Sequence, residues 1–87
     1  MKRYTIEYLP FEARQEATSH AVYSIYDNDT LAGVGILSVL EYNDKYRIER
    51  NGEVRFFTSL TDLLKSIDND IVDFDYPDEL YALLGKG

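Results

Sequence analysis

The segment from Leu31 to Tyr42 constrains the fold most, because its twelve positions are nearly continuous in apolar residues. Turn-forming residues bound it on both sides, Asp27-Asn28-Asp29 before it and Asn43-Asp44-Lys45 after it. The segment is too short to cross a bilayer and is typical of a central β-strand that is covered on much of both faces. Gly33 and Gly35 lie in its first half and predict a bulge or a close approach of two backbones.

Two segments before this strand also predict β-structure. Arg3 to Leu9 alternates with the period of a half-buried strand and places three apolar side chains on one face, namely Tyr4, Ile6 and Tyr8. Ala21 to Tyr26 predicts a second strand. Residues 11–19 follow Pro10 and lack β-branched residues over most of their length, which favours a short helix between the two strands. The alternative is an extended segment that joins the second strand.

The segment from Tyr46 to Thr58 predicts a β-hairpin around Asn51-Gly52. A two-residue turn would pair Arg50 with Glu53 and leave both faces of the hairpin mixed in polarity. A three-residue loop, Arg50-Asn51-Gly52 with Gly52 left-handed, gathers apolar side chains on one face: Tyr46, Ile48, Val54 and Phe56. We predict the three-residue loop, although it sets like charges opposite one another in the pairs Glu49–Glu53 and Arg47–Arg55.

A helix is predicted from about Leu60 to Asp68. Ser59 precedes Asp62 at the spacing of an N-terminal cap, and apolar residues then recur at helical intervals, at Leu60, Leu63, Leu64 and Ile67. The turn-forming run Asp68-Asn69-Asp70 ends this helix.

The chain after this helix predicts an extended segment from Ile71 to Phe74 and then a final helix that Pro77 opens. Asp78 and Glu79 occupy the first turn of the final helix, where the helix dipole favours negative charge. Its inward side chains are Leu80, Leu83 and Leu84, and Gly85 ends it.

These elements predict a single α+β domain over residues 1–87. In this domain a small antiparallel sheet of about four to five strands packs against one or two short helices, with a final C-terminal helix. The composition agrees, because 87 residues with 45% hydrophobic side chains, eight Tyr and four Phe supply one core and no second.

The chain contains no Cys, which excludes disulfides, thiolate metal sites, iron–sulfur clusters and cysteine nucleophiles. The basic start Met-Lys-Arg precedes an alternating segment instead of the apolar run of a secretory signal. No segment is apolar over the length of a membrane span. We therefore expect a cytoplasmic protein without a membrane partner.

Negative charge is concentrated in the C-terminal third. From Asp62 to Glu79 there are seven acidic residues and one basic residue, so this segment carries −6 of the formal net charge of −7. A field of this sign repels phosphate backbones and attracts basic surfaces. We therefore expect a basic protein surface as the partner and no direct contact with nucleic acid.

Motifs for metal binding and catalysis are incomplete. Counted from Asp68, a calcium-binding loop needs an oxygen ligand at the position of Val72 and a Gly at that of Asp73. Gly33-Val34-Gly35 has Ser38 in place of the third Gly of a dinucleotide-binding motif. His20 is the single histidine, and we interpret it as structural. We expect no cofactor, no metal ion and no enzyme activity.

Tyrosine side chains outside the predicted core stripes are candidates for binding, because Tyr is enriched where proteins contact one another. Combined with the acidic residues, they define the predicted partner-binding residues Asp68, Asp70, Asp73, Asp75, Tyr76, Asp78, Glu79 and Tyr81. A stacking platform for nucleic acid is disfavoured, because the three arginines of the hairpin are interleaved with Glu49 and Glu53.

Two resemblances bear on function. Leu37-Ser38-Val39, Tyr46-Arg47-Ile48 and the segment from Phe57 to Leu64 resemble the order of central strands and second helix in Src-homology phosphotyrosine-binding domains. The arginine that this family places in the strand matching residues 22–26 is missing, so the resemblance implies a shared hairpin-then-helix pattern without the phosphate pocket. In size and charge the chain is similar to small phage-encoded inhibitors of bacterial defence or transcription proteins, including anti-CRISPR proteins.

The sequence therefore predicts a small acidic, non-enzymatic binding protein, an inhibitor that docks on a basic surface that normally holds nucleic acid. The alternative is an orphan structural or oligomerisation module whose acidity serves solubility. A third hypothesis is a small-ligand binder or an enzyme with an unrecognised carboxylate site.

Overall fold

The computed structural model describes residues 2–10, 19–40 and 45–84. These residues form a six-stranded sheet in the order β5-β4-β3-β2-β1-β6. Five strands follow one another as antiparallel neighbours, and their bounds are β1 (Tyr4–Tyr8), β2 (Ser19–Asp27), β3 (Ala32–Leu40), β4 (Tyr46–Arg50) and β5 (Glu53–Phe57). The sixth, β6 (Phe74–Asp75), pairs with β1 in parallel.

Two short helices, α2 (Leu60–Lys65) and α3 (Asp78–Leu84), complete the α+β fold together with the 3-10 turn η1 (Ile71–Asp73). The predicted fold class is confirmed, but the sheet has six strands instead of four to five and is mixed instead of antiparallel. The additional strand is β6, in which Phe74 and Asp75 pair with β1. The predicted extended segment 71–74 is wrong over residues 71–73, which form η1.

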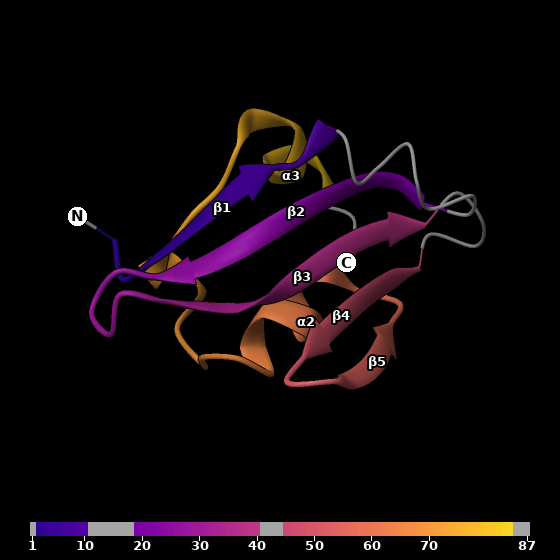
Figure 1. Ribbon diagram of the computed structural model, residues 1–87. Coiled ribbons are helices and arrows are strands. Elements are labelled where there is room, and N and C mark those ends of the chain that lie inside the picture. Colours follow the sequence, from indigo (N-terminus) through magenta and orange to yellow (C-terminus); the bar gives the residue numbers. More distant parts are fainter. Residues whose placement is uncertain (1, 11–18, 41–44, 85–87) are drawn as a thin grey trace.

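Both helices lie behind the same face of the sheet (Figure 1). The core fills the space between them and the strands, and its most buried side chains include Tyr4, Ile6, Tyr23, Ile25, Leu37, Ile48, Leu60, Leu63, Leu64, Phe74 and Leu80. The predicted inward residues of both helices are confirmed, since Ile67, Leu83 and Leu84 pack against this core while partly exposed. No helix among the described residues is long and apolar enough to cross a membrane.

The two glycines of β3 have the backbone roles expected of them. Ile25 pairs with Gly35 and Tyr26 pairs with Gly33, so Val34 is the extra residue of a β-bulge. A Cβ atom on Gly35 would lie 2.6 Å from the carbonyl oxygen of Glu49, which is a close approach of two backbones.

The turn from β2 to β3 is an Asx turn, as predicted. The Asp27 carboxylate accepts hydrogen bonds from the backbone N–H groups of Asp29 and Thr30, and Arg3 donates to it at 3.2 Å. Burial alone would raise the pKa of Asp27, but these hydrogen bonds and the charge of Arg3 hold the pKa below its ordinary value. The contact between Arg3 and Asp27 thereby fixes the start of β1. The strand β1 in turn pairs with β6.

The predicted three-residue loop in the β4–β5 hairpin is wrong. Arg50 pairs with Glu53, Ile48 with Arg55 and Arg47 with Phe56, so Asn51 and Gly52 form a two-residue turn with φ of 53° and 81°. Two left-handed residues give a turn whose twist matches that of the flanking strands. The mixed polarity of the faces is tolerated because β5 is an edge strand, on which Val54 and Phe56 are exposed.

The expected left-handed conformation of Gly52 is confirmed, and it allows a prediction. Gly52→Val should lower the free energy of unfolding by about 1–2 kcal/mol, because a β-branched residue is strained at positive φ. Gly33→Val is the control, since a Cβ atom at either glycine meets nothing within 4 Å and only Gly52 has a positive φ. Equal losses in urea denaturation of the two variants would contradict the assignment of the cost to backbone strain.

The helix that begins at Leu60 is capped as predicted but is shorter than expected. The Ser59 side chain accepts a hydrogen bond from the Asp62 backbone N–H, and α2 ends at Lys65, three residues before Asp68. The Ser66 hydroxyl donates to the Leu63 carbonyl at 2.6 Å, which satisfies one of the free carbonyls at the helix end. Of the helix predicted over residues 11–19, residues 11–18 lie outside the described residues, whereas Ser19 belongs to β2, so the prediction is wrong at that residue. The predicted stop at Gly85 also lies outside the described residues.

Candidate functional site

The segment from Asp68 to Leu84 leads from the end of α2 around the sheet edge to α3. Asp68 accepts a hydrogen bond from the Asp70 backbone N–H at 3.0 Å, and Asp70 accepts one from the Val72 N–H at 3.2 Å. These two carboxylates therefore shape the turn that opens η1. Phe74 and Asp75 then pair with Tyr4 and Thr5 of β1, which fixes the segment to the sheet.

Four aromatic rings connect the core to the surface along this segment. Tyr4 stacks on Phe74 with ring centroids 4.6 Å apart, and Phe74 stacks on Tyr76 at 6.4 Å. Tyr81 meets the edge of Tyr76 at 5.7 Å and an interplanar angle of 85°. Tyr4 and Phe74 are buried, whereas Tyr81 is 67% exposed. Tyr81 is thus an exposed ring whose position is set by rings that continue into the core.

A hollow of about 380 Å³ lies beside these rings. On the side of α3 it is bordered by Tyr81 and Leu84, and on the side of the preceding segment by Asp75 and Tyr76. Its remaining wall residues are Lys2, Ile71, Val72 and Phe74. Val72 is 60% exposed, so apolar surface is open to solvent on both sides of the hollow. Its apolar walls and its single wall carboxylate make the hollow able to take the stem and the charged head of a basic side chain.

Tyr76 is held at the hollow by its own hydroxyl group. The hydroxyl donates a hydrogen bond to the Ile71 carbonyl, which ties the chain after β6 to η1. Burial raises the pKa of the Tyr76 phenol, and the nearby Tyr81 and the negative charge of Asp70 raise it further. Asp70 directly precedes Ile71, which lines the hollow.

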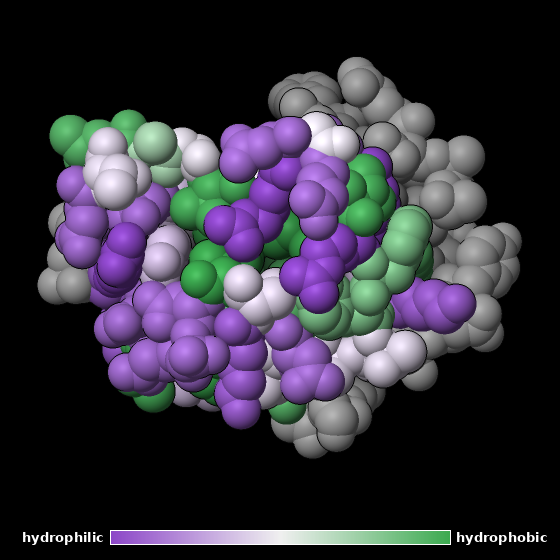
Figure 2. All heavy atoms as spheres, turned by 90° about the horizontal axis from the view of Figure 1, so that it is seen from below, coloured by the Kyte–Doolittle hydropathy of each residue, from purple (hydrophilic) through white to green (hydrophobic). Residues whose placement is uncertain are grey.

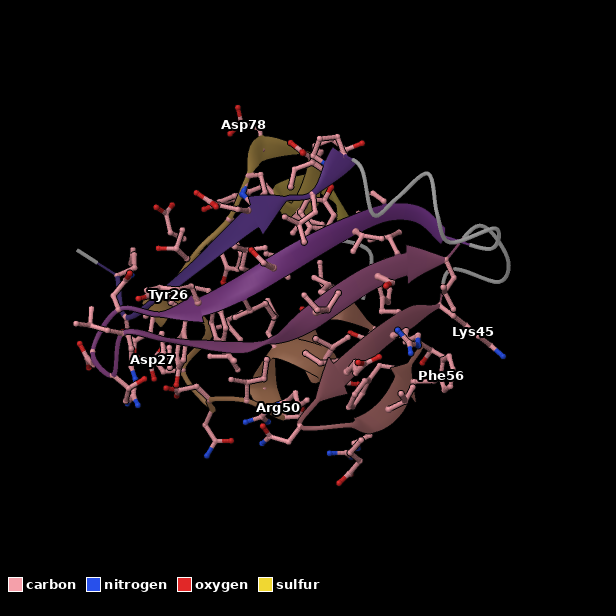
Figure 3. The ribbon with its side chains drawn as sticks, in the orientation of Figure 1. Tyr26, Asp27, Lys45, Arg50, Phe56 and Asp78 are labelled. Atoms are coloured by element: carbon pink, nitrogen blue, oxygen red, sulfur yellow. The ribbon has the colours of Figure 1, made fainter. Side chains whose placement is uncertain are left out.

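The predicted partner-binding residues divide into two groups. Asp75, Tyr76 and Tyr81 line the hollow. Asp70 and Asp73 adjoin its wall residues Ile71 and Val72 in the sequence, and Asp78 precedes Tyr81 by about one helical turn. We call these six residues the acidic aromatic surface. Figure 3 shows Asp78 at the start of α3 with its carboxylate directed away from the sheet. No carboxylate of this surface forms an ion pair with any cationic group within residues 2–10, 19–40 and 45–84. Within the described residues, these carboxylates therefore have no ion-pair partner.

Asp68 and Glu79 are placed elsewhere. Asp68 lies near Tyr4. Burial raises the pKa of Tyr4, and the negative charge of Asp68 raises it further. Glu79 projects from the other side of α3, where it borders a separate hollow of about 460 Å³ with Leu83 and Tyr23. The helical spacing explains the position of Glu79, because residues 81 and 84 share one side of α3 and residues 79 and 83 share another.

The Tyr23 hydroxyl donates a hydrogen bond to the Glu79 carboxylate at 3.4 Å. Burial, followed by the charge of Glu79, raises the pKa of Tyr23 to about 12. In the unfolded chain a Tyr titrates near 10, so the folded state favours the protonated phenol. The stability that Tyr23 contributes is therefore complete below about pH 10 and is lost as the pH rises toward about 12.

A Tyr23→Phe variant should consequently lose less of its free energy of unfolding between about pH 10 and pH 12 than the wild-type protein does. Chemical denaturation at a series of pH values measures this slope. Tyr26→Phe is the control, because Tyr26 is 39% exposed. A Tyr23→Phe curve parallel to that of the wild-type protein would contradict the coupling.

The part of the chain that the structure describes contains no group of three His, Asp or Glu side chains that could hold a metal ion. The hairpin arginines lie apart from the acidic aromatic surface. Arg50 and Arg55 line a hollow of about 190 Å³ with Glu53 and Ser66, next to the end of α2.

Sequence reasoning missed the apolar walls of the hollow. Phe74 was read only as part of an extended segment, and Val72 and Leu84 were not linked to binding. The available signal was the apolar pair Ile71-Val72 inside an otherwise acidic run. Lys2 could not be found from the sequence, because it reaches the site only through the pairing of β1 with β6.

Comparison with protein-family models, with curated proteins and with solved structures finds no match to this chain.

Proposed function

We propose that this chain is a small non-enzymatic binding protein that docks on a basic protein surface through the acidic aromatic surface. The observation that carries the proposal is the exposed Tyr81 ring, held edge-on by Tyr76 beside a hollow whose walls are mainly apolar and include the Asp75 carboxylate. Exposed tyrosines that are already fixed in position lose little entropy on binding and are frequent at the centres of protein interfaces.

The chemistry of the hollow selects a Lys or Arg side chain of the partner. Its aliphatic stem would cover Val72 and Leu84, and its charge would lie near the Tyr81 ring and the Asp75 carboxylate. Lys2 also borders the hollow and reduces the local field. The neighbouring acids Asp70, Asp73 and Asp78 outweigh this single positive charge.

A basic protein surface that normally holds nucleic acid is the partner that fits best, because it offers several closely spaced cations to several carboxylates. In this proposal the chain acts as an inhibitor that occupies the nucleic-acid-binding surface. The proposal is supported by the negative charge and the small size of the chain, in which it is similar to phage-encoded inhibitors.

A second candidate function, a structural module with acidity for solubility, is favoured by the local roles of Asp68 and Asp70. Both carboxylates accept backbone hydrogen bonds within the segment, and Asp62 and Asp78 lie in first turns of helices. Asp73 lies in the first turn of η1. Among the described residues, Asp75 has no side-chain hydrogen bond or ion pair of this kind. The two candidates therefore differ in what Asp73, Asp75 and Tyr81 do.

Purification of the partner from the native host, with the immobilised chain as bait, supplies the test. The isolated partner should bind fast at low salt. Its affinity should fall markedly between about 50 and 500 mM salt, because the salt screens the electrostatic attraction between the two proteins. Tyr81→Ala should weaken binding by about 30-fold or more with an unchanged melting temperature, because the ring is exposed. Tyr26→Ala, at another exposed tyrosine, is the control. Binding that is insensitive to salt and to Tyr81→Ala would contradict the proposal.

A further inference from the structure

Among the described residues, the strand β5 is paired on one side only, with β4, so its outer side is an edge of the sheet that these residues form. Its residues Glu53–Phe57 contain no Pro, no Lys and no bulge, which are the devices that commonly block a sheet edge. Val54 is 39% exposed and Phe56 is 61% exposed. Figure 2, which views the molecule from the side of β5 and α2, shows hydrophobic side chains at the surface between hydrophilic ones.

The two-residue turn determines which backbone groups of β5 are free. The residues that flank such a turn, Arg50 and Glu53, exchange hydrogen bonds, and hydrogen-bonded pairs then alternate along the ladder. Glu53, Arg55 and Phe57 therefore direct their N–H and C=O groups toward β4. Val54 and Phe56 direct theirs outward, where an additional strand can pair with them.

We propose that two copies of this chain associate through β5, antiparallel and with the two-fold axis at Val54. This register places Glu53 of each copy opposite Arg55 of the other, so two pairs of opposite charge form on one face of the joined sheet. On the other face Val54 meets Val54, and Phe56 lies opposite Gly52, where a Cβ atom would meet nothing within 4 Å. The strand is thus complementary to itself in both charge and shape.

Two alternative registers keep the same backbone pairing but lose this complementarity. With the axis at Arg55, the arginines of the two copies would face each other. With the axis at Phe56, Glu53 would lie beyond the opposing strand and Arg55 would face Phe57. Arg55 already lies over the Phe57 ring of its own chain, 5.1 Å from the centroid, so that contact would bring little that is new. Charge therefore selects the register centred on Val54.

The dimer is independent of the proposed function, because β6 and the acidic aromatic surface lie at the opposite edge of the sheet. Each dimer would expose two such surfaces at its outer ends. Figure 3 shows Phe56 at the margin of the sheet beside β5, far from Asp78. Variants of β5 should leave the binding of the basic partner to a single acidic aromatic surface unchanged.

Sedimentation velocity of the purified full-length chain from about 5 μM to about 1 mM tests the dimer, since a short edge interface is expected to bind weakly. The wild-type protein should show a reversible monomer–dimer equilibrium. Glu53→Arg and Arg55→Glu should each weaken the dimer about tenfold or more through like-charge repulsion. An equimolar mixture of the two variants should restore it, because every position 53 then faces a position 55 of opposite charge.

Val54→Pro tests the backbone pairing separately. This change removes only an N–H group that points outward, whereas Val54→Ala retains that group. Val54→Pro should abolish the dimer, and Val54→Ala should weaken it only slightly, with circular dichroism confirming that both variants fold. A wild-type protein that remains monomeric at about 1 mM would overturn the proposal. The proposed register would be overturned if the charge changes did not weaken the dimer, or if the mixture of the two variants did not restore dimerisation.

Discussion

The double charge reversal Asp73→Lys/Asp75→Lys is expected to abolish binding of the basic partner while leaving the fold intact. Each replacement turns an attraction into a repulsion within the acidic aromatic surface, and together they change the formal net charge from −7 to −3. Neither side chain forms a hydrogen bond or ion pair among the described residues, so stability should change little. We expect a loss of affinity of about 100-fold or more in a titration of the purified partner.

Glu7→Lys/Glu49→Lys is the matched control, since it changes the net charge by the same amount on the open face of the sheet. Glu7 and Glu49 are exposed, and the ion pair of Glu49 with Arg47 is on the surface. This control should retain most of the affinity. Equal losses in the two double variants would show that only the total charge matters, which would contradict a localised docking surface.

Leu64→Ala is expected to lower the free energy of unfolding by about 2–5 kcal/mol. The Leu64 side chain is 0% exposed in α2, between the sheet and the rest of the core. Removing it leaves a cavity that neighbouring side chains fill only partly. A loss of this size is a large share of the stability of a small domain, which is about 5–15 kcal/mol.

Leu31→Ala is the corresponding control, because the same atoms are removed from a side chain that is 74% exposed. Urea denaturation of both variants measures the difference. If Leu64→Ala and Leu31→Ala had the same stability, α2 would not pack on the sheet through Leu64.

Local patterns in the sequence predicted the parts of the fold that depend on local chemistry. The Ser59 cap, the helical spacing of Leu60, Leu63 and Leu64, and the Asx turn at Asp27 all agree with the structure. Each is determined by residues within a few positions of one another. The bulge at Gly33 to Gly35 was predictable for the same reason.

Features that depend on distant residues were not predictable in the same way. The hairpin register was predicted from a rule that apolar side chains gather on one face, and that rule fails for β5 because it is an edge strand with Val54 and Phe56 exposed. The parallel pairing of β6 with β1 joins residues about 70 positions apart, and no local sequence pattern predicts this pairing.

The candidate site shows the same division. The acids and tyrosines of the 68–81 segment were identifiable from composition, but the separation of Glu79 from Tyr81 depends on which side of α3 each residue occupies. The hollow itself forms only where Lys2, η1, β6 and α3 meet. Its apolar walls could therefore be assigned only from the three-dimensional arrangement.

Mapping the surface that the partner covers tests the docking proposal most directly. Amide chemical-shift changes in the 15N-labelled chain, recorded during titration with the purified partner, report this surface residue by residue. The account predicts that the largest changes fall between Asp70 and Tyr81, with further changes at Lys2 and Leu84. Changes confined to the β4–β5 hairpin around Arg47, Arg50 and Arg55 would contradict it.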